Sequence, residues 1–123
     1  MANEIIVTTA FEVPGRKVVK VLGIARGNTV RARNFGRDIG AGLKNLVGGE
    51  IKTYTEMTAQ SRDEAFNRMI NDALAMGADA IIGFNFSTSM VMQGASEMLA
   101  YGTAVKLAWF FEIKILEFLS FIC

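Results

Sequence analysis

The chain of 123 residues contains no histidine. Hydrolytic centres built on serine or cysteine need a histidine base, so neither a Ser-His-Asp nor a Cys-His arrangement can form. Acid–base catalysis at neutral pH would instead need a carboxylate or lysine whose pKa lies far from its usual value. The composition therefore predicts a protein that is not an enzyme.

Cysteine is almost absent, since Cys123, the last residue, is the only one. No disulfide can form within the chain, which fits a reducing compartment, and we expect a cytoplasmic protein. The N-terminal residues lack a basic segment followed by an apolar run, so they do not resemble a signal peptide. Soft metals prefer cysteine or histidine, which leaves Met90, Met92 and Met98 as soft ligands, although methionine usually fills a core.

The net charge is only +1, which gives no general attraction for nucleic acid or acidic lipid. Basic residues gather in one acid-free stretch without interleaved aromatics: Arg16, Lys17, Lys20, Arg26, Arg31 and Arg33. Nucleic-acid-binding surfaces commonly combine both residue types. The solvated face of an edge strand explains the stretch better, and we expect no nucleic-acid partner.

The sequence pattern of residues 4–32 predicts β-strands. Residues 4–9 are β-branched, Val13–Gly15 predict a turn, and residues 17–32 predict a long strand. Both faces of that strand are largely apolar, with Val19, Val21, Gly23 and Ala25 alternating with Val18, Lys20, Leu22 and Ile24. We therefore expect this strand to be buried on both sides.

Two helices are expected next. The spacing of Ile39, Leu43, Leu46 and Val47 predicts a glycine-containing helix over residues 35–48. Thr53 and Glu56 form a capping-box pattern ahead of a second helix that ends near Gly77. Its expected apolar stripe comprises Tyr54, Met57, Ser61, Ala65, Met69 and Ala73.

Residues 78–87 and 97–109 alternate as a pair of strands. The segment between them, residues 88–96, is expected to be a mobile link in which Gln93-Gly94 could supply a bend. The expected fold is α+β, in the order β-β-α-α-β-β, with the helices on one face of a largely antiparallel sheet.

The glycine pair Gly48-Gly49 falls between the two expected helices. A phosphate-binding loop would carry a GK[ST] ending, which is missing here, so a helix–helix corner is the favoured interpretation. Arg37 and Asp38 could form a surface ion pair or half of an intersubunit salt bridge. The carboxylate of Asp79, just after a helix end, would more often bind backbone amides than perform chemistry.

Several segments together resemble the YbjQ-like family of small bacterial and archaeal proteins. They are RNFGRDIGAGLKNLVGGEIKTYTE, MGADAIIGFNF and AYGTAVKL, which cover roughly residues 5 to 106. The matching positions are Arg37, Asp38, Ala41, Gly42, Val47–Glu50, Tyr54, Arg62, Ala65, Gly77–Gly83 and Tyr101–Val105.

The resemblance implies a dodecin-like subunit, residues 1–106, that closes into a homo-oligomeric ring, typically a pentamer. The resemblance also implies heavy-metal binding, and no activity is assigned to the family. We expect a metal ion or small ligand between subunits, with Arg37, Asp38, Glu50, Tyr54 and Asp79 as ligand-binding candidates. Around a ring axis, Glu50 or Asp79 could hold a hard cation.

Residues 107–123 continue past the family pattern as an apolar extension with three charges, Glu112, Lys114 and Glu117. They could extend the last strand or dock on a neighbouring subunit, and FEIKI alternates as a strand would. They could also anchor the ring to a membrane surface, or be an appended segment. The alternative function is therefore an assembly or membrane-associated structural protein that acts through this tail.

Overall fold

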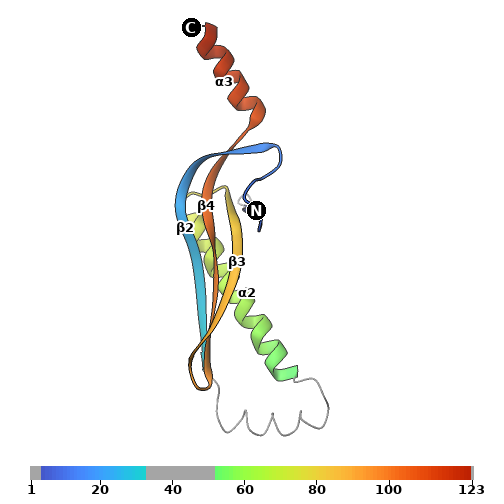
Figure 1. Ribbon diagram of the computed structural model, residues 1–123, viewed down its shortest axis with the longest axis vertical. Helices are drawn as coiled ribbons and strands as arrows, with labels where there is room; N and C mark the ends of the chain where they lie inside the picture. Colours follow the sequence, from blue (N-terminus) through green and yellow to red (C-terminus); the bar gives the residue numbers. More distant parts are fainter. Residues whose placement is uncertain (1–3, 33–51, 123) are drawn as a thin grey trace.

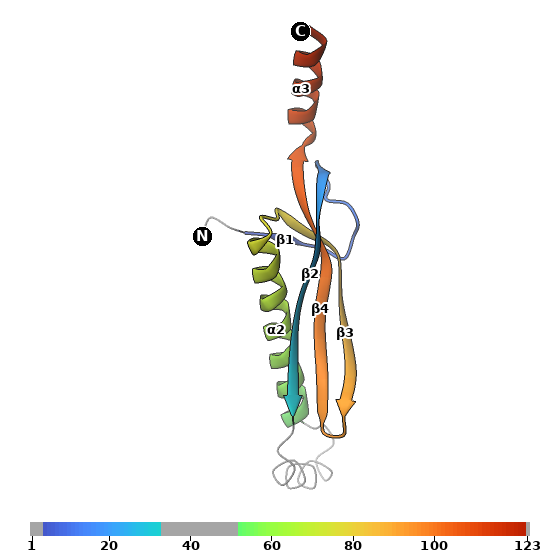
Figure 2. The ribbon, with the colours of Figure 1, turned by 90° about the vertical axis from the view of Figure 1, so that its left-hand side faces the viewer.

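The structure, a computed structural model, describes residues 4–32 and 52–122. The first expected helix, the Gly48-Gly49 corner, Arg37, Asp38 and Glu50 lie outside these residues. A four-stranded sheet has the order β1-β3-β4-β2, α2 packs on one of its faces, and α3 projects beyond the end of β4 (Figures 1 and 2). The elements are β1 (Ile6–Val7), β2 (Arg16–Ala32), α2 (Lys52–Ala75), β3 (Ala80–Met92), β4 (Ala95–Trp109) and α3 (Phe110–Ile122).

The sheet is largely antiparallel, as expected. Strand β4 lies between β2 and β3 and pairs antiparallel with both, whereas the short β1 runs parallel to β3. The turn before β2 is also confirmed: the Arg16 N–H donates to the Val13 carbonyl (3.1 Å), and Gly15 has φ 78°. The basic residues from Arg16 to Arg31 lie on an edge strand, because β2 ends the strand order.

Strand β2 is not buried on both faces, which corrects the expectation. Helix α2 covers Ala25, Gly27 and Thr29, whereas Ile24 is 67% exposed and Val30 is 55% exposed on the other face. The predicted alternation also fails along the strand, because the register with β4 shifts between Val18 and Lys20 and again between Val21 and Gly23. Each irregularity changes which face the following residues join.

Helix α2 follows the predicted stripe closely. Ser61, Ala65, Met69 and Ala73 are all buried against the sheet. The helix ends at Ala75 and Gly77 follows with φ 80°, the left-handed conformation expected of a C-terminal glycine. The predicted N-cap is wrong: the helix already includes Lys52, so Thr53 lies inside it.

The mobile link expected between the last two strands does not exist. Strand β3 continues through Met92, and the chain reverses at Gln93-Gly94, where Gly94 has φ 80°. The added residues pair with β4, from Thr88 opposite Met98 to Met92 opposite Ala95. The expected bend at Gln93-Gly94 is therefore confirmed, and it is the whole connection between the two strands.

The core between α2 and the sheet is thin. Many of its residues are alanines, while Met69 and Ile81 are its largest fully buried side chains. The ring of Phe84 packs edge-to-face against both Phe66 and Phe86, with centroids 5.3 and 4.9 Å apart.

The strand interpretation of FEIKI is wrong, because β4 ends at Trp109 and α3 follows. The Trp109 N–H donates to the Glu112 carboxylate (3.1 Å), a side-chain bond that satisfies a main-chain donor where the helix starts. The Arg16 guanidinium lies 4.7 Å from the centre of the Trp109 ring.

Among the residues that the structure describes, no helix combines the length and the apolar character needed to cross a membrane.

Candidate functional site

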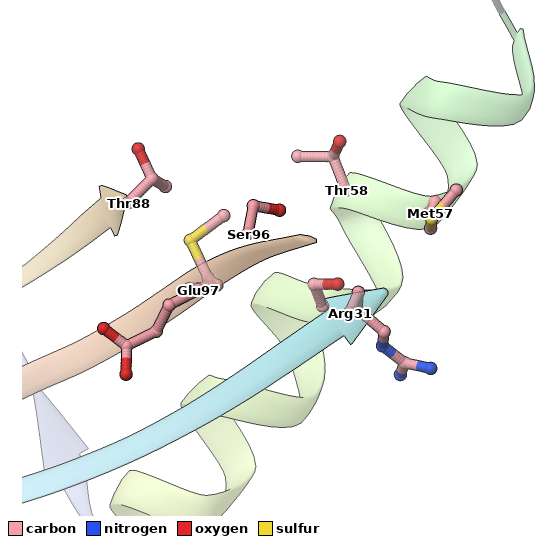
Figure 3. A pocket seen from close by; sticks show the side chains of 8 residues that line it. Arg31, Met57, Thr58, Thr88, Ser96 and Glu97 are labelled. Carbon is pink, nitrogen blue, oxygen red and sulfur yellow. The ribbon is translucent and has the colours of Figure 1, made fainter. Parts of the chain in front are cut away.

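A hollow of about 270 Å³ opens where α2 begins and where β2, β3 and β4 come together near the β3–β4 turn (Figure 3). Three elements contribute hydroxyl groups, from Thr58 and Ser61 on α2, Thr88 on β3 and Ser96 on β4. Its remaining lining residues are Arg31, Met57, Glu97 and Met98.

Two bonds between β2 and α2 hold this end of the molecule together. The Thr29 hydroxyl donates to the Ser61 carbonyl (3.2 Å) in a buried position. The Arg31 guanidinium pairs with the Glu64 carboxylate at 2.7 Å. The Asn28 side-chain amide donates to the Glu97 carboxylate (3.0 Å). Both charged residues of the lining therefore already have protein partners.

The chemistry of the lining is that of a small polar binding site. Hydroxyl groups can donate and accept hydrogen bonds, and the thioethers of Met57 and Met98 add polarizable apolar surface. No histidine exists to activate Ser61 or another hydroxyl as a nucleophile. The lining therefore offers hydrogen-bonding and polarizable groups, and a Ser-His nucleophile cannot form in it.

A metal ion fits the described residues poorly. Within residues 4–32 and 52–122, no three side chains of aspartate, glutamate or cysteine gather as a ligand set. Met57 and Met98 are two soft ligands beside the hollow, where Arg31 adds a positive charge. Met98 is buried in the core, whereas Met90 and Met92 are exposed on the β3 end. One chain alone therefore shows no complete metal site in its described part.

The structure describes two of the predicted site residues, Tyr54 and Asp79, and does not bring these two together. Tyr54 lies in the first turn of α2. Asp79 lies beyond the other end of α2, where its carboxylate accepts from the Leu107 N–H (2.9 Å) and approaches the Lys106 amine at 3.7 Å. At about 1.5 Å per residue, the length of α2 places Tyr54 and Asp79 roughly 30 Å apart. These two residues cannot share one small ligand within a single protomer.

The residues of the hollow were not among the predicted site residues. One signal in the sequence points to them, because Ser61 is a polar residue at a buried position of the α2 stripe. The contributions of Thr88 and Ser96 had no such signal. Their positions depend on the extension of β3 and on its register with β4.

Sequence comparisons find relatives of one kind in several organisms. UPF0145 proteins are similar along nearly their whole length: that of Archaeoglobus fulgidus is 58% identical over 107 residues, covering 87% of this chain and 99% of that protein. The UPF0145 protein of Methanoculleus marisnigri is 61% identical over 102 residues, covering 83% and 95%. That of Thermotoga maritima is 54% identical over 102 residues, covering 83% and 96%.

A solved structure supports the fold. A crystal structure of a protein of unknown function from Pediococcus pentosaceus, assigned to the DUF74 family, has a TM-score of 0.58 at 18% identity. The match covers 85% of this chain and 98% of that chain. The YbjQ family model, described as "Putative heavy-metal-binding", matches residues 5–108. With this match over most of its length, the chain belongs to the YbjQ family.

Proposed function

We propose that this protein is a non-enzymatic, homo-oligomeric binding protein, a pentameric ring in its simplest form, that holds a metal ion or small ligand between subunits. The observation that carries the proposal is the sheet face opposite α2. On that face, a single chain leaves large apolar side chains in contact with water.

The register of the sheet defines this open face. Ile24, Arg26, Asn28 and Val30 of β2 lie opposite Thr103, Tyr101, Leu99 and Glu97 of β4, so these side chains share one surface. Asn85, Ser87 and Ser89 of β3 extend it. Apolar residues therefore alternate with polar and oppositely charged ones, Arg26 and Glu97. Such a mixture suits a surface that is covered by another subunit.

The second feature that supports assembly is the outer edge of β3. Strand β1 pairs with β3 only at Ala80 and Ile81, so no described strand covers β3 from Asn85 to Met92. Uncovered edges of this length invite pairing with another chain. The open face and this edge together give one subunit two surfaces for contact with its neighbours.

Sharing between subunits also supports the ligand part of the proposal. Of the ligand-binding candidates, Tyr54 and Asp79 lie at opposite ends of α2, so these two do not share a site in one protomer. A ring brings several copies of one side chain around its axis. Carboxylates repeated in this way supply the oxygen ligands that hard cations need.

Native mass spectrometry of the untreated protein tests both parts together. We expect a closed homo-oligomer, and elemental analysis of the same sample should report a retained metal in a fixed ratio to subunits. Titration with divalent and soft ions should saturate. A single-chain mass contradicts the assembly, whereas an oligomer without retained mass or saturable binding removes the ligand.

A variant of Asp79 separates ligand binding from folding. In Asp79→Asn, the amide oxygen can still accept from the Leu107 N–H, while the negative charge is lost. We expect unfolding stability to change by less than about 1 kcal/mol, because the Lys106 ion pair is partly exposed. Loss of ion binding with retained stability would place Asp79 at the site. Asp63→Asn, at an exposed α2 position, is the matched control.

A further inference from the structure

Helix α3 stands apart from the rest of the molecule. It continues from the end of β4 and projects away from the sheet and from α2 (Figures 1 and 2). The family model ends at residue 108, before α3 begins at Phe110. The helix is therefore an addition to the family domain, and its apolar side chains need an explanation of their own.

The apolar residues of α3 form a seam with the spacing of a helix bundle. Phe111, Ile115, Phe118 and Ile122 follow one another at intervals of four, three and four residues. This alternation of three and four is the pattern by which helices pack side by side. All four side chains are between 51% and 63% exposed, so the seam has no partner within the described chain.

The two flanks of the seam complement each other. At about 100° per residue, Lys114 and Phe121 lie on one flank, and Glu112 and Leu119 lie on the other. When parallel copies stand around an axis, one flank of each helix faces the opposite flank of the next. Lysine then faces glutamate and phenylalanine faces leucine, so both charge and apolar surface are matched.

We propose that α3 of each subunit packs against α3 of neighbouring copies, forming a parallel bundle along the axis of the oligomer. The occupant of the seam is thus a second copy of this chain. The inference rests on the homo-oligomer proposed above, because only an assembly holds several copies of α3 in parallel at one end.

A lipid surface is a poorer partner for this helix. Helices that lie in a membrane interface usually gather basic residues on one polar face. Helix α3 has one lysine and two glutamates, and Lys114 and Glu112 lie on opposite flanks. Its charges therefore suit a neighbouring helix better than an acidic headgroup layer.

Cross-linking of full-length protein tests the bundle. In a Cys123→Ser background, Ile115→Cys places a thiol in the seam, and Leu116→Cys places one outside the seam, about 100° further round the same helix. Leu116 is 66% exposed, so the control is at least as accessible as the seam position. Identical seam positions meet in a parallel bundle. We expect a short bis-maleimide to convert most Ile115→Cys protein to covalent dimers and little of the Leu116→Cys protein. Equal yields, or none at Ile115→Cys, would overturn the bundle.

Native mass spectrometry of both cysteine variants distinguishes this failure from that of the proposed function. An oligomeric mass without Ile115→Cys cross-links overturns the bundle alone. A single-chain mass overturns the homo-oligomer, and the bundle with it. Flotation with phosphatidylcholine vesicles, with and without phosphatidylserine, tests whether α3 binds a lipid surface instead. We expect the oligomer to stay unbound, whereas co-flotation without seam cross-links would show that α3 binds lipid.

Discussion

Gly27 shows at the scale of one residue why a glycine stands in a strand. A Cβ atom at this position would collide with main-chain atoms of Ala65 and Met69 in α2. Glycine within a strand normally weakens it, and close approach of another backbone is one physical reason to keep it. The helix can lie this near to β2 because position 27 has no side chain.

Gly27→Ala should therefore destabilise the fold. The colliding atoms belong to the helix backbone, which can move away only if the whole packing of α2 on the sheet changes. We expect a loss of about 2 kcal/mol or more in the free energy of unfolding, measured by chemical denaturation. Gly94→Asn is the control, because Gly94 has open space around it and asparagine tolerates its positive φ. A Gly27→Ala loss as small as that of Gly94→Asn would contradict the close packing.

At the scale of elements, α2 does more than cover one face of the sheet. Its Asp72 carboxylate accepts from the Arg26 N–H (3.0 Å), and its Arg68 guanidinium donates to the Asn28 carbonyl (2.7 Å). Both main-chain groups belong to β2, which is an edge strand. The helix thus occupies edge groups that could otherwise pair with another chain.

Asp72→Ala should expose this part of the edge. Hydrogen exchange followed by NMR should show faster exchange of the Arg26 amide, by about fivefold, which corresponds to about 1 kcal/mol for one net hydrogen bond. Asp63→Ala, on the exposed side of the same helix, should leave the Arg26 amide unchanged. The same exchange rate in both variants would mean that the Asp72 contact does not protect the edge.

The helix and the strands also show where hydrophobic periodicity predicts burial correctly and where it does not. The α2 stripe was predictable because one helix face packs against one sheet, so Ala65, Met69 and Ala73 recur at helical spacing. In β2 the same kind of reasoning failed, since two register shifts interrupt the alternation. Both FEIKI and residues 88–92 were misassigned, because short apolar runs satisfy strand and non-strand patterns alike.

At the scale of the whole molecule, the open face is the surface through which we propose that this chain meets other copies of itself. Its apolar residues include Ile24, Val30 and Leu99, and a charged residue introduced there is harmless in a monomer but costly in an interface. Stability of an assembled protein depends on protein concentration, because dissociation and unfolding are linked.

Ile24→Glu should therefore abolish assembly without unfolding the subunit. For the unmodified chain we expect the Tm to rise by about 3 °C for a tenfold increase in concentration. For Ile24→Glu we expect a lower Tm that is independent of concentration, together with a smaller mass by sedimentation. Asn67→Glu, at an exposed α2 position, should behave like the unmodified chain. If the Tm of the unmodified chain does not change on dilution, the open face is not an interface.

The sequence alone determined the α+β class, the stripe of α2, the turn at Val13–Gly15 and the absence of histidine-based catalysis. These properties depend on local periodicity, on the φ freedom of glycine and on which side chains are present. Only the tertiary structure decided that one face of β2 is open, that Tyr54 and Asp79 lie at opposite ends of α2, and that hydroxyls from three elements meet in one hollow. Such relations depend on register and on the distance between segments, which no local pattern of residues encodes.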